Sequence, residues 1–529
     1  MSDANSQAYL RQLVDYIKAH STMYNEMLQR SGANCFKCMH KWKLNFTSGL
    51  TFISVVSLVN KFTNTYGYKQ GEEFSSKQGG KNTVSTTTLD AQLQSDPVIF
   101  HFIASKLKKD EYSYKLASSA IGSLGEKQQG SGLRISGYDS NTLGSNVPNE
   151  DRNVEGMLMN GAALLFAVFD GHKGQLCSEA LKQQLLNTAA EQIGPILSTR
   201  CPLLANTSIS PVTLDQHPGT HSCPVTCPIG FPTTCDIEAG LSPSAGDEIA
   251  MGLQETFVSM DQRLEQRARQ SAQKYQRTKT LTKEDLEHLK RFYQGSCALT
   301  TCVVSNQLYL ANTGDCRAVL GSKINGKWVT TGLTADQTAG NADEMIRLFK
   351  AHPGERVIRH GRLLGGLMPL RSFGDAEYKW PSEFLKDIVS LSPNYHTPPY
   401  LTAEPVLTHH TLENHDKFLI LATDGLWEKL TSEQAVQLIG KAIDGQKQEL
   451  RRESWFSGLF FKTRKPDDAI ESCPNSYTTL DTNLATYLIR QALGGDAKSL
   501  YNILNLSPGV SRGYRDDISV TVLYFNEEK

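Results

Sequence analysis

Acidic side chains at the ends of apolar segments are the first candidates for chemistry in this sequence. Asp170 directly follows the apolar run from Ala163 to Phe169, and Asp424 closes a second apolar run near residue 422. Two further acidic pairs directly precede apolar segments. The four sites are therefore two single residues, Asp170 and Asp424, and two pairs, Glu150-Asp151 and Asp516-Asp517. A single Asp before Gly is often only a turn residue, but four such sites together indicate a shared acidic centre.

Carboxylates at strand ends can meet at one edge of a sheet. Several of them without matching Lys or Arg repel one another unless cations neutralise them. Oxygen ligands of this kind are typical of hard divalent ions. The sequence therefore predicts a site for Mg²⁺ or Mn²⁺.

Strand-length apolar runs and hairpin turns predict the elements that carry these carboxylates. Residues 163–169 and 417–422 are continuous apolar runs, and residues 297–333 form several short alternating segments. Asn325-Gly326 is a typical two-residue hairpin turn. A long helix is predicted from residue 247 to about 273. Successive hairpins with segregated helices favour an antiparallel α+β layered domain over a parallel sheet.

The composition excludes some classes of protein. The chain has 529 residues, with 54 Lys+Arg against 55 Asp+Glu, so no global positive field indicates a nucleic-acid partner. No apolar run approaches about 18 residues, which predicts that there is no transmembrane segment. The chain has eleven cysteines, and most of them lie singly within apolar patterns. This favours a reducing compartment.

Composition also divides the chain. Residues 1–131 form a predicted N-terminal extension, with a helix over 8–30, a basic segment without acidic residues over 27–71, and a polar linker. Residues 132–526 form the predicted main domain. A Pro-, Ser- and Thr-rich insertion at about 200–247 interrupts this domain as a surface loop.

An ordered series of motifs over about residues 132–526 resembles the metal-dependent protein Ser/Thr phosphatases of type 2C. The motifs are NEDR at 149–152, FDGHKG at 169–174, GSCALTTCVV at 295–304, ANTGDCRAVL at 311–320, LRSFGD at 370–375, LTAEP at 401–405, LATDGLW at 421–427 and YRDDISVTVLYF at 514–525. The resemblance implies a fold of two packed antiparallel β-sheets flanked by helices, with the metals in a cleft at one edge.

The resemblance also implies a role for each site residue. Asp170 would bridge two metal ions, the Gly171 carbonyl would bind one of them, and Asp424 with Asp516 would complete the second. Further implied roles are metal-bound waters for Glu150 and Asp151, a third, weaker ion for Asp315, and general acid for His172. Two ions roughly 3.5–4 Å apart can lower the pKa of a shared water and screen phosphoryl oxygens, and a nearby His can protonate the leaving oxygen.

Two positions depart from the common family pattern. Asn146 stands where most members have an Arg that grips the substrate phosphate, and one branch of the family shares this Asn. Lys173 stands where the family normally has Gly. Three alternatives stay open for Lys173: it crowds the cleft, it acts as a cation that lowers the pKa of His172, or it points into solvent.

The branch that shares Asn146 is that of the mitochondrial pyruvate dehydrogenase phosphatases, and several segments resemble it more closely. The resemblance implies phosphorylated pyruvate dehydrogenase as substrate, with the lipoyl-bearing transacetylase core and a regulatory subunit as further partners. It also implies the mitochondrial matrix as the compartment. Two alternatives stay open: an active phosphatase with another substrate, and a weakly active or inactive binding module.

The N-terminal sequence is not a typical transit peptide, because Asp3, Asp15 and Glu26 are acidic. The stretch from about Met39 to the linker is basic and rich in Ser and Thr, and no acidic residue precedes Glu72. We therefore expect a mitochondrial address in this stretch, with an ordinary basic linker as the alternative.

Overall fold

The computed structural model describes residues 97–115, 134–200, 211–213, 243–385, 391–457 and 481–526. The predicted helix over 8–30 and the predicted mitochondrial address lie outside the described residues. Most of the insertion at about 200–247 does so as well.

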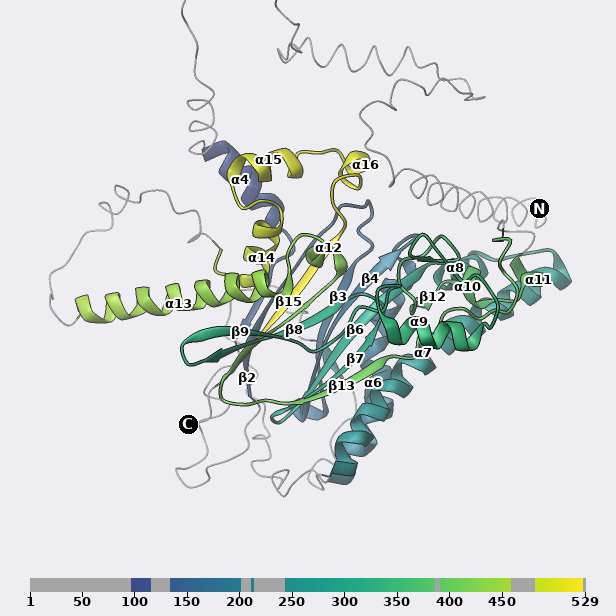
Figure 1. Cartoon of the computed structure of the whole chain (residues 1–529), viewed down its shortest axis with the longest axis horizontal. Coiled ribbons are helices and arrows are strands. Elements are labelled where there is room, and N and C mark those ends of the chain that lie inside the picture. The colour runs from purple at the N-terminus through teal and green to yellow at the C-terminus, as the bar shows by residue number, and fades with distance from the viewer. Residues whose placement is uncertain are drawn as a thin grey trace, which may run out of the picture.

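The fold is built on two antiparallel sheets, shown in Figure 1. The first sheet has six strands in the order β1-β2-β15-β14-β8-β9. Their bounds are β1 Tyr112–Lys115, β2 Ile135–Leu143, β8 Arg317–Ile324, β9 Lys327–Gly332, β14 Asp416–Ala422 and β15 Ile518–Phe525. Asn325 and Gly326 form the turn between β8 and β9 with positive φ angles of 50° and 77°, as the sequence predicts.

The second sheet has seven strands, six of them in the order β13-β7-β6-β4-β3-β5 and β12 paired with β6. Their bounds are β3 Arg152–Leu158, β4 Ala163–His172, β5 Val212–Thr213, β6 Gly295–Val304, β7 Gln307–Thr313, β12 Phe373–Gly374 and β13 Val406–Thr411. A separate two-stranded ribbon joins β10 Ile358–Arg359 to β11 Arg362–Leu363.

Helices cover the outer face of each sheet. Three helices pack against one another over the second sheet: α6 Leu176–Arg200, α7 Pro243–Thr278 and α8 Lys283–Tyr293. The first sheet is covered by α13 Ser432–Ser457 and α14 Leu484–Ala492. Besides α4 Pro97–Leu107, the other described helices are α9 Ala342–Ala351, α10 Ala376–Lys379, α11 Ser382–Leu385, α12 Asp424–Trp427, α15 Ala497–Leu504, α16 Pro508–Ser511 and the short 3₁₀ helix Met159–Gly161. No described helix is both long and apolar enough to cross a membrane.

The continuous apolar run of β4 follows from its position between two hydrophobic cores. Leu164, Phe166 and Val168 belong to the core between the two sheets. The alternate residues, such as Leu165 and Ala167, belong to the core between the second sheet and its helices. A strand with both faces buried has no polar face, and its first polar side chain therefore comes at its end, at Asp170.

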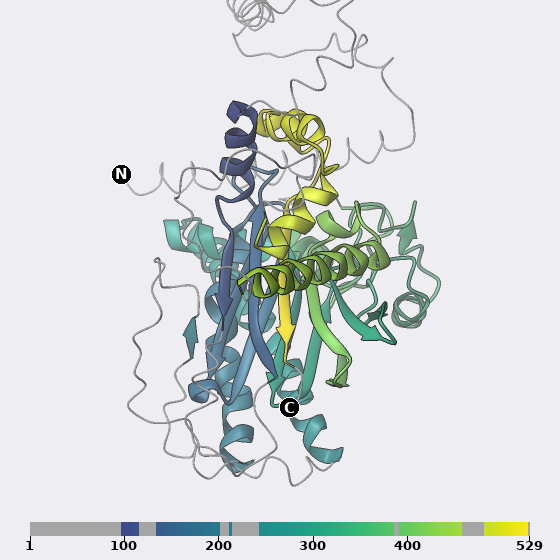
Figure 2. The ribbon, with the colours of Figure 1, turned by 90° about the vertical axis from the view of Figure 1, so that its left-hand side faces the viewer.

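The predicted α+β fold with two packed antiparallel sheets is confirmed. The sheet begins earlier in the chain than residue 132, however, because part of the predicted N-terminal extension belongs to it. Strand β1 pairs with β2, and helix α4 (Pro97–Leu107) packs beside α15. Figure 2 shows α4 and α15 side by side. Ile99, Ile103 and Leu107 place the apolar face of α4 in the core between the first sheet and its helices.

Candidate active site

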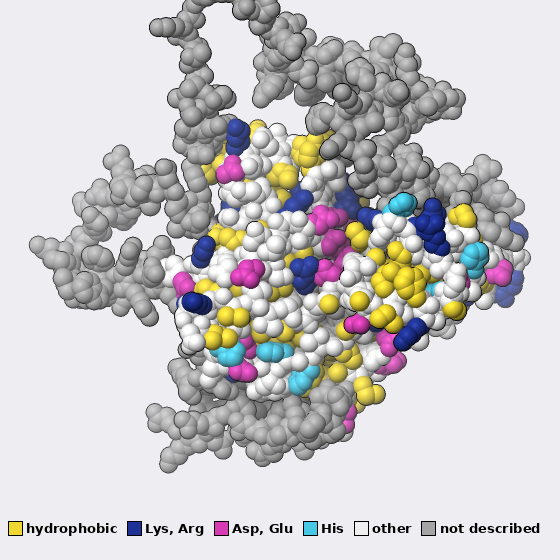
Figure 3. Space-filling view, in the orientation of Figure 1, with side chains coloured by type: hydrophobic (Ala, Val, Ile, Leu, Met, Phe, Trp, Pro, Cys, Tyr) yellow, Lys and Arg dark blue, Asp and Glu magenta, His cyan; other side chains and the backbone are white. Residues whose placement is uncertain are grey.

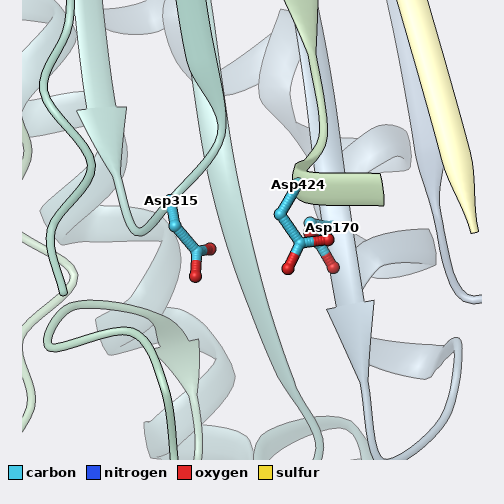
Figure 4. A group of neighbouring side chains, drawn as sticks. All are labelled: Asp170, Asp315 and Asp424. Atoms are coloured by element: carbon cyan, nitrogen blue, oxygen red, sulfur yellow. The ribbon is translucent and has the colours of Figure 1, made fainter. Parts of the chain in front are cut away.

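Three of the predicted carboxylates meet at one end of the two sheets. Asp170 lies near the end of β4, Asp315 lies in the turn between β7 and β8, and Asp424 begins α12 just after β14. Each offers a carboxylate oxygen, and these oxygens all lie within 4.8 Å of one another. Figure 4 shows the carboxylates of Asp170 and Asp424 next to each other, with Asp315 across the same space.

Ionisation of all three carboxylates of this triad is electrostatically unfavourable. Burial raises the pKa of Asp424 to about 7, and the Asp315 carboxylate adds to the rise. Burial, followed by the Asp424 carboxylate, raises the pKa of Asp170 well above its usual range. Burial raises the pKa of Asp315 as well. Among the described residues, no Lys or Arg forms an ion pair with any of the three.

This donor set fits a hard divalent cation. It offers only carboxylate oxygens, and it holds more negative charge than the surrounding side chains neutralise. A cation bound there would displace the protons that the raised pKa values retain near neutral pH.

A second group of acidic residues lies close to the triad. Asp151 is buried and accepts a hydrogen bond from Thr423 Oγ1 at 2.8 Å. Burial, followed by the Asp517 carboxylate, raises the pKa of Glu150 to about 7. Asp517 accepts hydrogen bonds from the backbone N–H groups of Asn146 and Glu150, both at 2.8 Å. Asp517 thus fixes the loop that carries Glu150.

Asp516 is not part of the group of three carboxylates. Its carboxylate forms an ion pair with Arg512 Nη1 instead. The structure therefore brings together Asp170, Asp424 and Asp315 of the predicted ligands and leaves Asp516 beside them with a cationic partner. Asn146, at the position of the predicted phosphate contact, donates through Nδ2 to Glu150 Oε2 at 3.2 Å and to Asp517 Oδ2 at 2.9 Å.

Gly171 brings Glu150 close to the end of β4. A Cβ atom at position 171 would lie 2.3 Å from the Glu150 carbonyl oxygen and 2.8 Å from Ser178 Oγ. Ser178 Oγ donates a hydrogen bond to the same carbonyl. Any side chain at position 171 would therefore push the Glu150 backbone away from β4.

His172 is held by a buried carboxylate that sequence analysis did not assign. Its Nε2 lies 2.7 Å from Asp375 Oδ2, and the Asp375 side chain is fully buried. Ser372 Oγ also donates to Asp375 Oδ2, at 2.6 Å. The pairing favours the tautomer with the proton on Nε2 and leaves Nδ1 as the nitrogen for proton transfer. Gly295 makes room for the pair, because a Cβ atom there would lie 2.1 Å from His172 Nε2.

Lys173 lies in an enclosed site next to this pair. Its Nζ donates to Asp375 Oδ1 at 2.7 Å and to Glu377 Oε1, and it lies 5.0 Å and 5.5 Å from the ring centres of Tyr378 and Tyr293. Burial alone would lower the pKa of Lys173, but the two carboxylates outweigh burial and raise it well above its usual range. The alternative in which Lys173 points into solvent is therefore wrong.

We expect Lys173→Gly to destabilise the protein. Lys173 has φ of 62°, and Gly would relieve about 1–2 kcal/mol of left-handed backbone strain. Loss of the cation would leave Asp375 and Glu377 without their shared partner, and breaking a buried ion pair costs about 3–5 kcal/mol. The lost ion pair outweighs the relieved strain, so the net effect on stability is unfavourable. The free energy of unfolding from urea titration should fall by about 1–4 kcal/mol, which is the difference between the two.

Lys279→Gly is the matched control for this substitution. Lys279 also has a positive φ, of 54°, but it is exposed and its Nζ lies over the ring of Tyr275. Gly there relieves the strain without removing a buried ion pair, so stability should stay equal or rise. A Lys173→Gly protein as stable as wild type would contradict the role of the buried cation.

The chain is similar to known protein phosphatases over most of its length. The Protein phosphatase 2C family matches residues 244–455. The chain is 31% identical over 464 residues to human mitochondrial [pyruvate dehydrogenase [acetyl-transferring]]-phosphatase 1, covering 80% of this chain and 82% of that protein. It is 32% identical over 433 residues to the human mitochondrial phosphatase 2 of the same name, covering 74% and 78%. It is 34% identical over 412 residues to a protein phosphatase 2C homolog of Schizosaccharomyces pombe, covering 74% and 80%.

Proposed function

Because this chain belongs to the protein phosphatase 2C family and is a protein serine/threonine phosphatase, we propose that it dephosphorylates and thereby reactivates pyruvate dehydrogenase. The observation that carries this proposal is similarity over about three quarters or more of the chain to two human proteins named for that activity. The carboxylate triad at the ends of the strands supports a catalytically active member of the family rather than an inactive binding module.

We propose that the site holds two Mg²⁺ or Mn²⁺ ions. Asp170, the Gly171 carbonyl, Asp424 and Asp516 would hold these ions, Asp315 would contribute to a third, weaker position, and Glu150 with Asp151 would orient water molecules. When bound, the ions would lower the pKa of a water in the site and screen the phosphoryl oxygens.

The proton for the leaving group would come from His172. Protonation of the serine oxygen as its bond to phosphorus breaks prevents the formation of a poor, strongly basic leaving group. Asp375 would hold the ring through Nε2 and stabilise its protonated form, at the observed 2.7 Å. Lys173 and Ser372 in turn fix the orientation of Asp375.

We propose a mitochondrial location, since the names of the human relatives include it. The matrix, the lipoyl-bearing transacetylase core and a regulatory subunit are further predictions of the resemblance, for which we assign no residues.

The test compares substrates on the purified protein. With Mg²⁺ or Mn²⁺ present, we expect phosphate release from phosphorylated pyruvate dehydrogenase to be faster than from generic phosphoserine peptides of equal concentration. Addition of a chelator should stop release from both, and Asp170→Asn protein serves as the inactive control.

Equal rates on both substrates would favour the alternative of an active phosphatase with another substrate. A protein that binds phosphorylated pyruvate dehydrogenase without releasing phosphate, under any of these metal conditions, would overturn the proposed activity.

A further inference from the structure

Bound cations would neutralise part of the acidic site, and a basic side chain beside it would further favour a phosphate ester. The site gathers the triad with Glu150, Asp151 and Asp517, and any carboxylate that cations do not neutralise repels the doubly charged phosphoryl group of a substrate. Figure 3 shows Asp and Glu side chains gathered near the middle of one face, with Lys and Arg side chains close to them.

Position 146 does not supply this charge. The Asn146 side chain is neutral, and its amide donates to the carboxylates of Glu150 and Asp517. Its observed role is to hold the acidic loop in place.

Most basic side chains on the neighbouring elements already have partners within the fold. Lys173 is enclosed by Asp375 and Glu377. The buried guanidinium of Arg515 donates to the carbonyls of Leu143 and Gly144. Arg152 pairs with Glu179 on α6. These three side chains serve the fold.

Arg512 differs from them in position and in exposure. Its neighbour Ser511 donates through Oγ to the carbonyl of Ser145 at 2.7 Å, which brings residue 512 close to the Asn146 loop. Its ion-pair partner Asp516 directly precedes Asp517, which binds Asn146 and Glu150. The Arg512 side chain is 36% exposed, so that a ligand can reach it.

The ion pair with Asp516 occupies one nitrogen of the Arg512 guanidinium, Nη1. A guanidinium carries five donors in a planar fork, so it can keep Asp516 on one nitrogen and bind a phosphate oxygen with the others.

We propose that Arg512 binds the phosphoryl group of the substrate and supplies the cation that position 146 lacks. This inference depends on the phosphatase function proposed above. Arg512 lies in the loop before β15, whereas Asn146 belongs to the loop after β2, and the Ser511–Ser145 hydrogen bond holds the two loops together.

The test uses Arg512→Gln in the full chain, with p-nitrophenyl phosphate as substrate and inorganic phosphate as competitive inhibitor. At saturating Mn²⁺, we expect the inhibition constant for phosphate and the KM to rise about 10- to 100-fold, as for a lost charge-assisted hydrogen bond, with a smaller change in kcat. Arg512→Lys, which keeps the charge but lacks the fork, should fall between wild type and Arg512→Gln.

Arg263→Gln is the matched control. Arg263 is a similarly exposed Arg, 40%, in an ion pair with Glu191 between α7 and α6, away from the acidic site. Its removal should leave the inhibition constant and the KM within about twofold of wild type, as expected for an exposed ion pair.

Three outcomes separate the explanations. Wild-type protein without activity on any phosphate ester would refute the proposed function and the role of Arg512 with it. Active Arg512→Gln protein with unchanged phosphate inhibition and KM would refute the role of Arg512 alone. A defect that appears at limiting Mn²⁺ and disappears at saturating Mn²⁺ would show that Arg512 acts on metal binding through Asp516, and it would overturn direct phosphate binding as well.

Discussion

Asp170→Asn is expected to abolish turnover. The substitution keeps the size of the side chain but removes the charge that faces Asp424 and Asp315 at the centre of the triad. Loss of this carboxylate should weaken cation binding at the whole site, and metal stabilisation of the reaction contributes several kcal/mol, which corresponds to about 10³-fold in rate or more. Two measurements check this: phosphate release from a phosphoserine peptide, and Mn²⁺ binding by isothermal titration calorimetry.

Asp416→Asn provides the control on the same strand. Asp416 begins β14 at the end opposite to Asp424, is buried, and binds His410 Nε2 at 3.0 Å and Ser322 Oγ at 2.6 Å. Its substitution also removes a buried carboxylate and is expected to reduce stability, but Mn²⁺ binding and activity should survive in the folded fraction. Full activity of Asp170→Asn, or unchanged Mn²⁺ binding, would refute the assigned role of Asp170.

The positions of Asp170 and Asp424 were predictable because their signal is local. A strand with two buried faces is a continuous apolar run, and the first carboxylate after it must lie near the sheet edge. The strands from residue 297 and the Asn325-Gly326 turn carry similarly local signals, but the predicted alternation is wrong for β6, which is buried at every position.

The contacts between distant segments were not predictable in this way. His172 and Asp375 are 203 residues apart, and the fold joins them through the pairing of β12 with β6 and of β6 with β4. The LRSFGD motif marks Asp375 as a candidate, but spacing alone gives it no partner. The same holds for the Lys173 enclosure, which depends on Tyr293, Glu377 and Tyr378 from two further elements.

The choice between adjacent residues is another limit of sequence reasoning. Asp516 and Asp517 look alike in the sequence, yet successive side chains near a strand point to opposite sides. Asp517 binds the loop of Asn146 and Glu150, while Asp516 forms an ion pair with Arg512. Helix α4 was missed for a related reason, because its short apolar stretch shows its partners only after the chain folds back onto α15.

The second large effect is expected for His172→Ala, and it should depend on the leaving group. Serine leaves as a strongly basic oxygen and needs a proton, so the rate on a phosphoserine peptide should fall by about 10²–10⁴-fold. The nitrophenolate of p-nitrophenyl phosphate leaves without protonation, so its rate should fall far less. The measurement is kcat on both substrates at saturating Mn²⁺, with His410→Ala as control, since His410 forms a similar pair with Asp416 away from the site.

Asp375→Asn tests whether the buried carboxylate acts through His172. Asn keeps a similar shape but cannot stabilise a protonated ring, so the rate on phosphoserine should fall, by less than in His172→Ala. In the His172→Ala background the same substitution should have little further effect on this rate, because residues that act as a unit are not additive. Equal losses on both substrates, or additive losses in the double variant, would mean that Asp375 only supports the fold. Reduced stability of Asp375→Asn alone does not distinguish these cases, since Lys173 would lose a partner in either; the leaving-group dependence does, because only a defect in proton transfer follows the basicity of the departing oxygen.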